Sequence, residues 1–200
     1  MDEKKRAALI RKLAADSAAN NRIDPALYKK YNVKRGLRND DGTGVLVGLT
    51  EVGEVFGYIM DDAERVPSEG RLFYQGIEIN DLVNGFYNEK RFGFEETAYL
   101  LLFGELPTPK QLHLFEKLLI SYRDLPLNFT EDMILKAPSP EIMNKLARTV
   151  LALYPYDPDP ESIEVENIIR QCTQLIARFP VLVSYGFMAK RHYVDKKSLY

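Results

Sequence analysis

Few side chains in this sequence could carry out chemistry, and those few are scattered. The two histidines are His113 and His192, and Cys172 is the single cysteine. Metal sites and nucleophile–base pairs need several such groups at suitable spacing, and none of these three has a partner at ligand spacing. We therefore expect no metal site, two solvent-exposed histidines, and a buried structural thiol at Cys172.

Carboxylates are more plentiful, but each group has an ordinary structural explanation. Glu95 and Glu96 stand where a helix is predicted to begin, and acidic residues there suit the helix dipole. The pairs at 40–41 and 61–62 fall in predicted loops. The basic run 34–38 could hold an anion, although the aspartates at 40–41 dilute its charge. We recognise no acid–base pair among them.

The glycine-rich segment Gly42–Gly48 invites comparison with nucleotide-binding loops. The dinucleotide fingerprint needs glycine at Val47, and the phosphate-binding loop needs a Gly-Lys-Ser/Thr ending that this segment lacks. The sequence also has no Gly-x-Ser-x-Gly turn of the α/β-hydrolase type. We therefore assign no catalytic, cofactor-binding or metal-binding residue and expect no cofactor.

The overall composition limits the partners and the compartment. A net charge of −2 offers no electrostatic reason to bind nucleic acid. There is no run of 18 apolar residues, so we predict no membrane span. A lone cysteine suits a reducing compartment, and the first nineteen residues lack the apolar centre of a signal peptide. We expect a cytoplasmic protein.

A short β-hairpin is predicted near residues 45–58 of an otherwise mainly α-helical chain. Val and Leu spaced by Gly and Thr in this segment favour two short strands with a turn near 51–54. Polar stretches at 34–44 and 61–70 are predicted as loops.

Residues 104–111 predict where one helix ends and the next begins. The segment Phe94–Phe103 is apolar on all sides, which predicts a deeply buried helix, and Gly104 can adopt the left-handed conformation that ends it. Thr108 and Gln111 then form a capping box for the next helix, with Pro109 at its first position.

Three further helices are predicted at 2–19, at 140–154 and from about 162 to 193. The proline-rich segment Pro155–Pro160 cannot be helical and is expected to be a stiff connector. The helix at 140–154 carries two apolar stripes, which imply contact with two neighbours, and the last helix has a wide apolar face. The stripes consist of Ile142, Leu146, Val150 and Leu153, and of Met143, Ala147, Leu151 and Tyr154; the wide face consists of Ile168, Cys172, Leu175 and Phe179, flanked by Val165, Ile169 and Ile176.

Two blocks of this sequence resemble signatures of the citrate synthase family. The block Gly70–Leu82 (GRLFYQGIEINDL) resembles the family's Gly-Arg-Leu…Tyr-Arg-Gly…Ile…Asp-Leu run, and Arg91–Thr108 (RFGFEETAYLLLFGELPT) resembles the block that follows it. Residues 140–143 and 168–180 are similar to two later family helices, and the details are most like enzymes of Gram-positive bacteria. One departure is Gln75, where the family usually has arginine.

The resemblance implies the helical large domain of an enzyme that makes citrate from oxaloacetate and acetyl-CoA. In the family an aspartate removes a methyl proton, two histidines act on the enolate and the ketone, and arginines hold the carboxylates. These groups lie on family blocks that do not occur here, and neither His113 nor His192 matches them. The resemblance therefore implies the N-terminal half of a citrate synthase, inactive without the C-terminal half that it lacks.

The resemblance also implies a domain division and a homodimer. Residues 1–33 would be an N-terminal helical extension, and residues 34–200 the truncated N-terminal part of the large domain. In the family, helices matching 140–154 and 162–192 pack against their counterparts in a second subunit. The predicted interface residues are Met143, Leu146, Ala147, Val150, Ile168, Cys172, Leu175 and Ile176.

Three functions fit these observations. The chain is a fragment of a citrate synthase, a fragment of an enzyme with another acyl-CoA specificity such as 2-methylcitrate synthase, or a self-contained helical module that serves as an interaction surface. The residues that distinguish the first two would lie in the absent half.

Overall fold

The computed structural model describes residues 1–31, 33, 48–61 and 64–198. These form two compact units: the first combines Met1–Ala14 with His113–Tyr200, and the second is Ala15–Leu112. The basic run 34–38, the aspartates at 40–41 and most of the glycine-rich segment lie outside the described residues. The predicted boundary between residues 33 and 34 remains a prediction.

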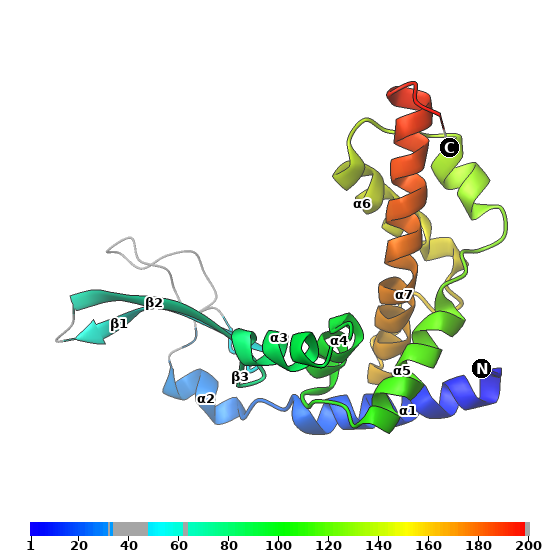
Figure 1. The fold of residues 1–200 in the computed structure, drawn as a ribbon. Helices are drawn as coiled ribbons and strands as arrows, with labels where there is room; N and C mark the ends of the chain where they lie inside the picture. Colours follow the sequence, from blue (N-terminus) through cyan, green and yellow to red (C-terminus); the bar gives the residue numbers. More distant parts are fainter. Residues whose placement is uncertain (32, 34–47, 62–63, 199–200) are drawn as a thin grey trace. The chain divides into compact units, whose positions relative to one another are not determined.

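The fold class is mainly helical with one small antiparallel sheet, as expected (Figure 1). Helix α1 (Glu3–Asn20) confirms the predicted N-terminal helix and contributes residues to both units. The short helix α2 (Pro25–Lys30) follows, capped by Asp24, whose carboxylate accepts a hydrogen bond from the amide of Ala26 at 2.9 Å.

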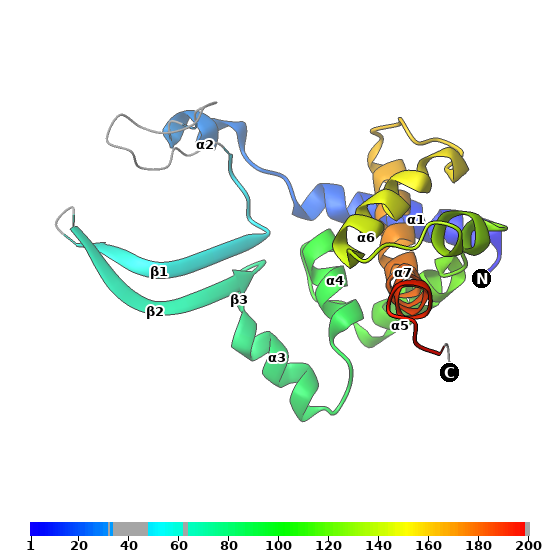
Figure 2. The same ribbon diagram turned by 90° about the horizontal axis from the view of Figure 1, so that it is seen from above.

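A long two-stranded ribbon dominates the sheet of the second unit (Figure 2). Strand β1 (Gly53–Asp61) pairs antiparallel with β2 (Glu64–Tyr74), and β2 pairs at its end with the two-residue strand β3 (Ile77–Glu78). Gln75 and Gly76 connect β2 to β3, and both have positive φ angles, of 49° and 77°. Two successive positive φ angles are typical of a tight hairpin turn.

The position of the predicted hairpin is wrong. Its strands were expected within 45–58, but the first described strand begins at Gly53 and pairs with 64–74, most of which was expected to be loop. The ribbon is largely exposed, with Val55 77% accessible. Charged residues such as Glu69 and Arg71 can therefore stand in a strand and keep their contact with water. The polar composition of this segment therefore did not exclude a strand.

Helices α3 (Ile79–Asn88) and α4 (Phe94–Phe103) complete the second unit. Tyr99, Leu100 and Phe103 of α4 are buried, but Phe94 is 61% exposed, so the helix is not buried on all sides as expected. The other residues of its first turn, 95–97, are half-buried. Gly104 ends α4 with φ 78°, as predicted.

The start of helix α5 (Pro109–Tyr122) confirms the capping box. The backbone amide of Thr108 donates to the Gln111 side chain at 2.8 Å, and the amide of Gln111 donates to the Thr108 hydroxyl at 3.4 Å. Phe115, Leu118 and Leu119 are the buried residues of α5.

The first unit is built around two packed helices, α6 (Ile142–Ala152) and α7 (Val165–Ala189). Turns of π-helix at η1 (Thr130–Leu135) and η3 (Lys190–Val194) and a 3₁₀ turn, η2 (Tyr154–Tyr156), complete it. Helix α7 contains Pro180 and continues past it to Ala189. A core cluster of this unit consists of Phe129, Ile134, Leu153, Leu182 and Ala189.

Several details of the first unit differ from expectation. Helix α6 begins at Ile142 and α7 at Val165, each two or three residues later than predicted. Pro155 lies in the 3₁₀ turn, although the segment was expected to contain no helix, because a proline near the start of a helical turn needs no amide partner. Boundary shifts of this size are common where helix ends fray.

Candidate functional site

The predicted interface residues lie on α6 and α7, which contact each other. On α6, Met143 and Ala147 are exposed, while Leu146 and Val150 are half-buried. On α7, Ile168 is exposed and the remaining three residues are half-buried: Cys172, Leu175 and Ile176. Leu146 and Leu175 pack against the core cluster, so the two helices already use part of this set within the chain.

The buried faces of both helices differ from the predicted apolar stripes. On α7 the buried residues include Ile169, which belongs to the predicted wide face, and Thr173 and Ala177, which do not. Cys172 is half-buried rather than buried. Burial raises the pKa of the Cys172 thiol, so this thiol is mostly protonated at neutral pH. The predicted face thus keeps apolar surface that this chain does not cover.

Lys145 is the buried centre of α6, and the apolar periodicity did not reveal it. Its side chain is 3% exposed, and its ammonium group donates to the backbone carbonyl of Ala137 at 2.9 Å and to that of Met133. Burial, with a smaller contribution from Arg148, lowers the pKa of Lys145. Lysine can occupy this position because its stem is apolar and its head finds acceptors.

A polar pocket of about 550 Å³ lies within the first unit, at the start of α7. Its walls come from α1, Tyr122 of α5, the connector after α6, and the first three turns of α7. Arg6 and Arg170 are its two basic residues, and its acidic residues are Glu3, Asp159, Glu164 and Glu166.

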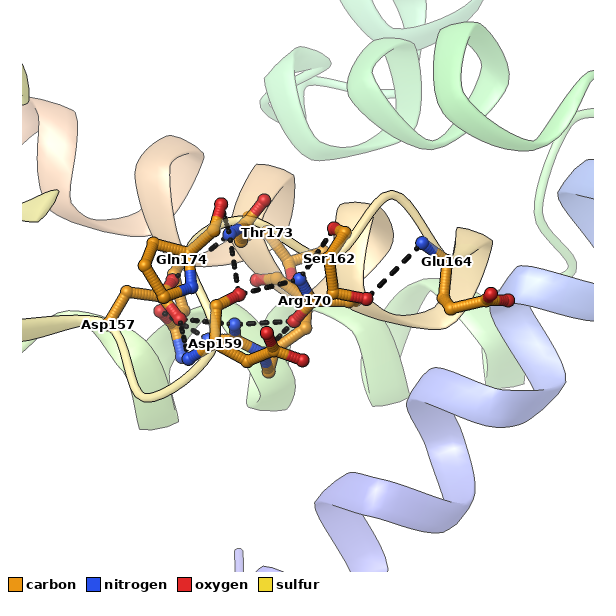
Figure 3. Close-up of polar contacts among 10 residues, drawn as sticks. Asp157, Asp159, Ser162, Glu164, Arg170, Thr173 and Gln174 are labelled. Atoms are coloured by element: carbon orange, nitrogen blue, oxygen red, sulfur yellow. Dashed lines mark hydrogen bonds and ion pairs between the residues drawn. The ribbon is translucent and has the colours of Figure 1, made fainter.

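One wall of this polar pocket is a network between the connector and α7 (Figure 3). Arg170 donates to Asp157 at 2.6 Å and to Asn167 at 2.6 Å. The Arg170–Asp157 ion pair is largely buried, since the two side chains are 19% and 15% exposed. Asn167 in turn donates to the carbonyls of Asp159 and Ser162, at 2.8 and 2.9 Å. The network therefore fastens the connector to the helix.

The charge of Asp157 is stabilised by this network. Burial by itself would raise the pKa of Asp157, but hydrogen bonds from Arg170 and from the Asp159 amide outweigh it, so the pKa is lowered. The carboxylate is ionised at neutral pH and engaged by Arg170, which suits a structural role better than proton transfer.

Within the described ranges, the histidines and the remaining carboxylates do not come together as a catalytic group. His113 is exposed as expected, 3.8 Å from Glu116, whereas His192 is half-buried beside the carbonyl of Lys197. Glu96 forms a forked pair with Arg91, at 2.6 and 3.1 Å, which raises the pKa of Arg91. No three His, Cys, Asp or Glu residues come together as metal ligands in the described part of the chain.

The comparisons with known proteins now decide the family. The family profile described as "Citrate synthase, C-terminal domain" matches residues 41–200. The chain belongs to the citrate synthase family. It is 31% identical over 153 residues to a 2-methylcitrate synthase 1 of Corynebacterium glutamicum, covering 76% of this chain and 34% of that protein.

The curated relatives include both citrate synthases and 2-methylcitrate synthases. A citrate synthase of Corynebacterium glutamicum is 30% identical over 176 residues, covering 88% of this chain and 36% of that protein. The crystal structure of citrate synthase from Pyrobaculum aerophilum matches the fold with a TM-score of 0.59 at 24% identity, covering 80% of this chain and 40% of that chain. The chain spans about a third of the length of the curated relatives it matches.

Gln75, where the resemblance led us to expect an arginine, has a defined partner in this structure. Its side-chain amide donates to the Asn21 side chain at 3.1 Å, and the Asn21 amide donates to the carbonyl of Leu102 at 3.3 Å. Neutral amides therefore link the β2–β3 turn to the end of α4. None of these hydrogen bonds involves a charged side chain.

Among the described residues, none of the helices has both the length and the hydropathy that crossing a bilayer requires.

Proposed function

We propose that this chain is the framework and subunit-interface portion of a citrate synthase, an acyltransferase that condenses acetyl-CoA with oxaloacetate at the entry to the tricarboxylic acid cycle. The family match over residues 41–200 supports this, together with the two histidines' different neighbours, Glu116 beside His113 and the Lys197 carbonyl beside His192. Enolate formation needs a base and donors held close together. We infer that these groups belong to polypeptide outside these 200 residues, and that this chain has no activity alone.

A 2-methylcitrate synthase is the second candidate. The relatives of both names from Corynebacterium glutamicum have nearly equal identity to this chain, 31% and 30%. The two enzymes differ in whether the thioester carries an acetyl or a propionyl group. The third candidate, a self-contained interaction module, is favoured only by the exposed apolar faces of α6 and the β-ribbon.

The test is a CoA thiol-release assay on the purified 200-residue chain, with oxaloacetate and either acetyl-CoA or propionyl-CoA. We expect no release above the enzyme-free blank, while a small amount of authentic citrate synthase added to the same mixture should give release. Activity that co-elutes with the chain and is lost in a His113→Ala/His192→Ala variant would contradict the proposal.

The coding sequence beyond the codon for Tyr200 distinguishes the enzyme from the module. A reading frame that continues into a His-Gly-Gly-Ala-Asn block supports an enzyme of this family. A stop codon with no such block encoded nearby supports the interaction module. If the longer chain exists, comparing acetyl-CoA with propionyl-CoA on it decides between the two enzymes.

We also propose that the chain forms a cytoplasmic homodimer through α6 and α7. The exposed Met143, Ala147 and Ile168 support this face, because apolar side chains left uncovered on neighbouring helices favour association. The lone cysteine is consistent with a reducing compartment.

A further inference from the structure

Besides the polar pocket, the first unit has a groove between the start of α1 and helix α5. Its volume is about 660 Å³. Leu9 of α1 and Leu114 and Ile120 of α5 provide apolar lining, and Ile120 is 60% exposed. The family match begins at residue 41, so the α1 side of this groove lies outside the segment that the family profile covers.

Lysines flank the apolar lining from both helices. Lys5 comes from α1 and Lys117 from α5, and both line the groove. Lys5 pairs with Asp2 at 3.0 Å, but the two side chains are highly exposed, so this pair is weak and easily exchanged for another carboxylate. The lining of the groove therefore combines apolar side chains with two positively charged ones.

We propose that this groove binds an amphipathic helix of a partner, whose apolar stripe is flanked by Asp or Glu residues. An open groove between two helices covers only one side of its occupant, and an amphipathic helix supplies a second side that stays in water. Small ligands, in contrast, are mostly enclosed by their pockets. Carboxylates beside the stripe would meet Lys5 and Lys117, which sets the orientation and the specificity.

The probe is a labelled 15-residue helical peptide with leucines at positions 3, 6, 10 and 13 and glutamates beside them, added to the complete 200-residue chain. Fluorescence anisotropy should show saturable binding that weakens with added salt. A peptide with the same leucines but lysines in place of the glutamates should bind at least about 10-fold more weakly, because like charges then oppose each other.

Variants of the chain locate the binding site. Ile120→Asp should weaken binding of the glutamate peptide about 10-fold or more, since it places a carboxylate among the apolar lining residues and against the peptide's own glutamates. Leu127→Asp is the matched control, because Leu127 is also exposed but lies outside the groove, and it should bind as the unchanged chain does. Lys5→Glu/Lys117→Glu should reverse the preference and bind the lysine peptide more tightly. Far-ultraviolet circular dichroism confirms that each variant is folded.

Three results would overturn the proposal. They are absence of binding up to millimolar peptide, equal binding of the two peptides, and equal effects of Ile120→Asp and Leu127→Asp. Self-association of the chain that Ile120→Asp abolishes would show that a second copy occupies the groove instead. None of these readouts depends on citrate synthase activity.

Discussion

At the scale of single residues, Lys145 shows how a charge can occupy a core without a carboxylate. Its ammonium group is received by backbone carbonyls of Met133 and Ala137, at the end of the η1 turn and just beyond it. Its stem passes over Gly186 of α7, where an added Cβ would come within 3.8 Å of the lysine Cγ. One side chain therefore joins η1, α6 and α7.

Lys145→Met should lower the free energy of unfolding by about 1–3 kcal/mol at pH 7, because it keeps most of the stem but leaves two carbonyls without their donor. The pKa of Lys145 is lowered in the folded state, so the unfolded chain binds more protons between that value and 10.5. Stability of the unchanged chain relative to Lys145→Met should therefore rise with pH across this window. Urea unfolding at pH 7 and pH 10 measures both effects, and a variant as stable as the parent at both values would contradict them.

At the scale of elements, the junction between α4 and α5 is stabilised by local signals and by a distant segment. Gly104 ends α4 in a left-handed conformation, and Thr108 and Gln111 cap α5. The Gln111 side chain also donates to the hydroxyl of Tyr99 at 3.2 Å. Asn20, from the end of α1, donates to the carbonyl of Phe103 at 2.7 Å and satisfies one of the last acceptors of α4.

Thr108→Ala should lower the free energy of unfolding by about 1 kcal/mol, since the amide of Gln111 loses its acceptor at the start of α5. Thr108→Ser keeps the hydroxyl and should retain most of the stability. Thermal and urea unfolding of the two variants provide the measurement. Equal losses in both variants would show that the threonine methyl group, rather than the cap, is responsible.

At the scale of the whole molecule, the dimer that we propose rests on apolar side chains of α6 that are exposed in this structure. Met143 is 78% exposed and Leu151 is 74% exposed. They lie on a different face of α6 from the buried Lys145 and Thr149. A stripe of this kind on a helix already packed on its other side is typical of an interface between subunits.

Sedimentation velocity at micromolar concentration should therefore detect a dimer. Met143→Asp should weaken the dimer at least about 10-fold, because a symmetric interface would place the new carboxylate in apolar surroundings twice. Leu127→Asp, on an exposed loop residue, should leave the dimer unchanged. A well-behaved monomer of the unchanged chain at these concentrations would exclude the proposed interface.

Sequence patterns predicted those features whose interacting groups lie close together in the chain. Thr108 and Gln111 are three residues apart, and Gly104 directly follows the helix that it ends, so chain geometry alone brings these groups into place. The hairpin was misplaced because a solvent-exposed ribbon has no buried face, and hence no strict alternation of apolar and polar residues from which to locate its strands.

The sequence by itself determined the family, the mainly helical class and the helix caps, because these depend on short motifs and on the periodicity of apolar side chains. Only the tertiary structure decided that Lys145 is buried, that Asp157 pairs with Arg170, and which faces of α6 and α7 remain uncovered. Each of these depends on groups brought together from separate turns or elements. The sequence around a charged residue does not indicate which groups its side chain will bind.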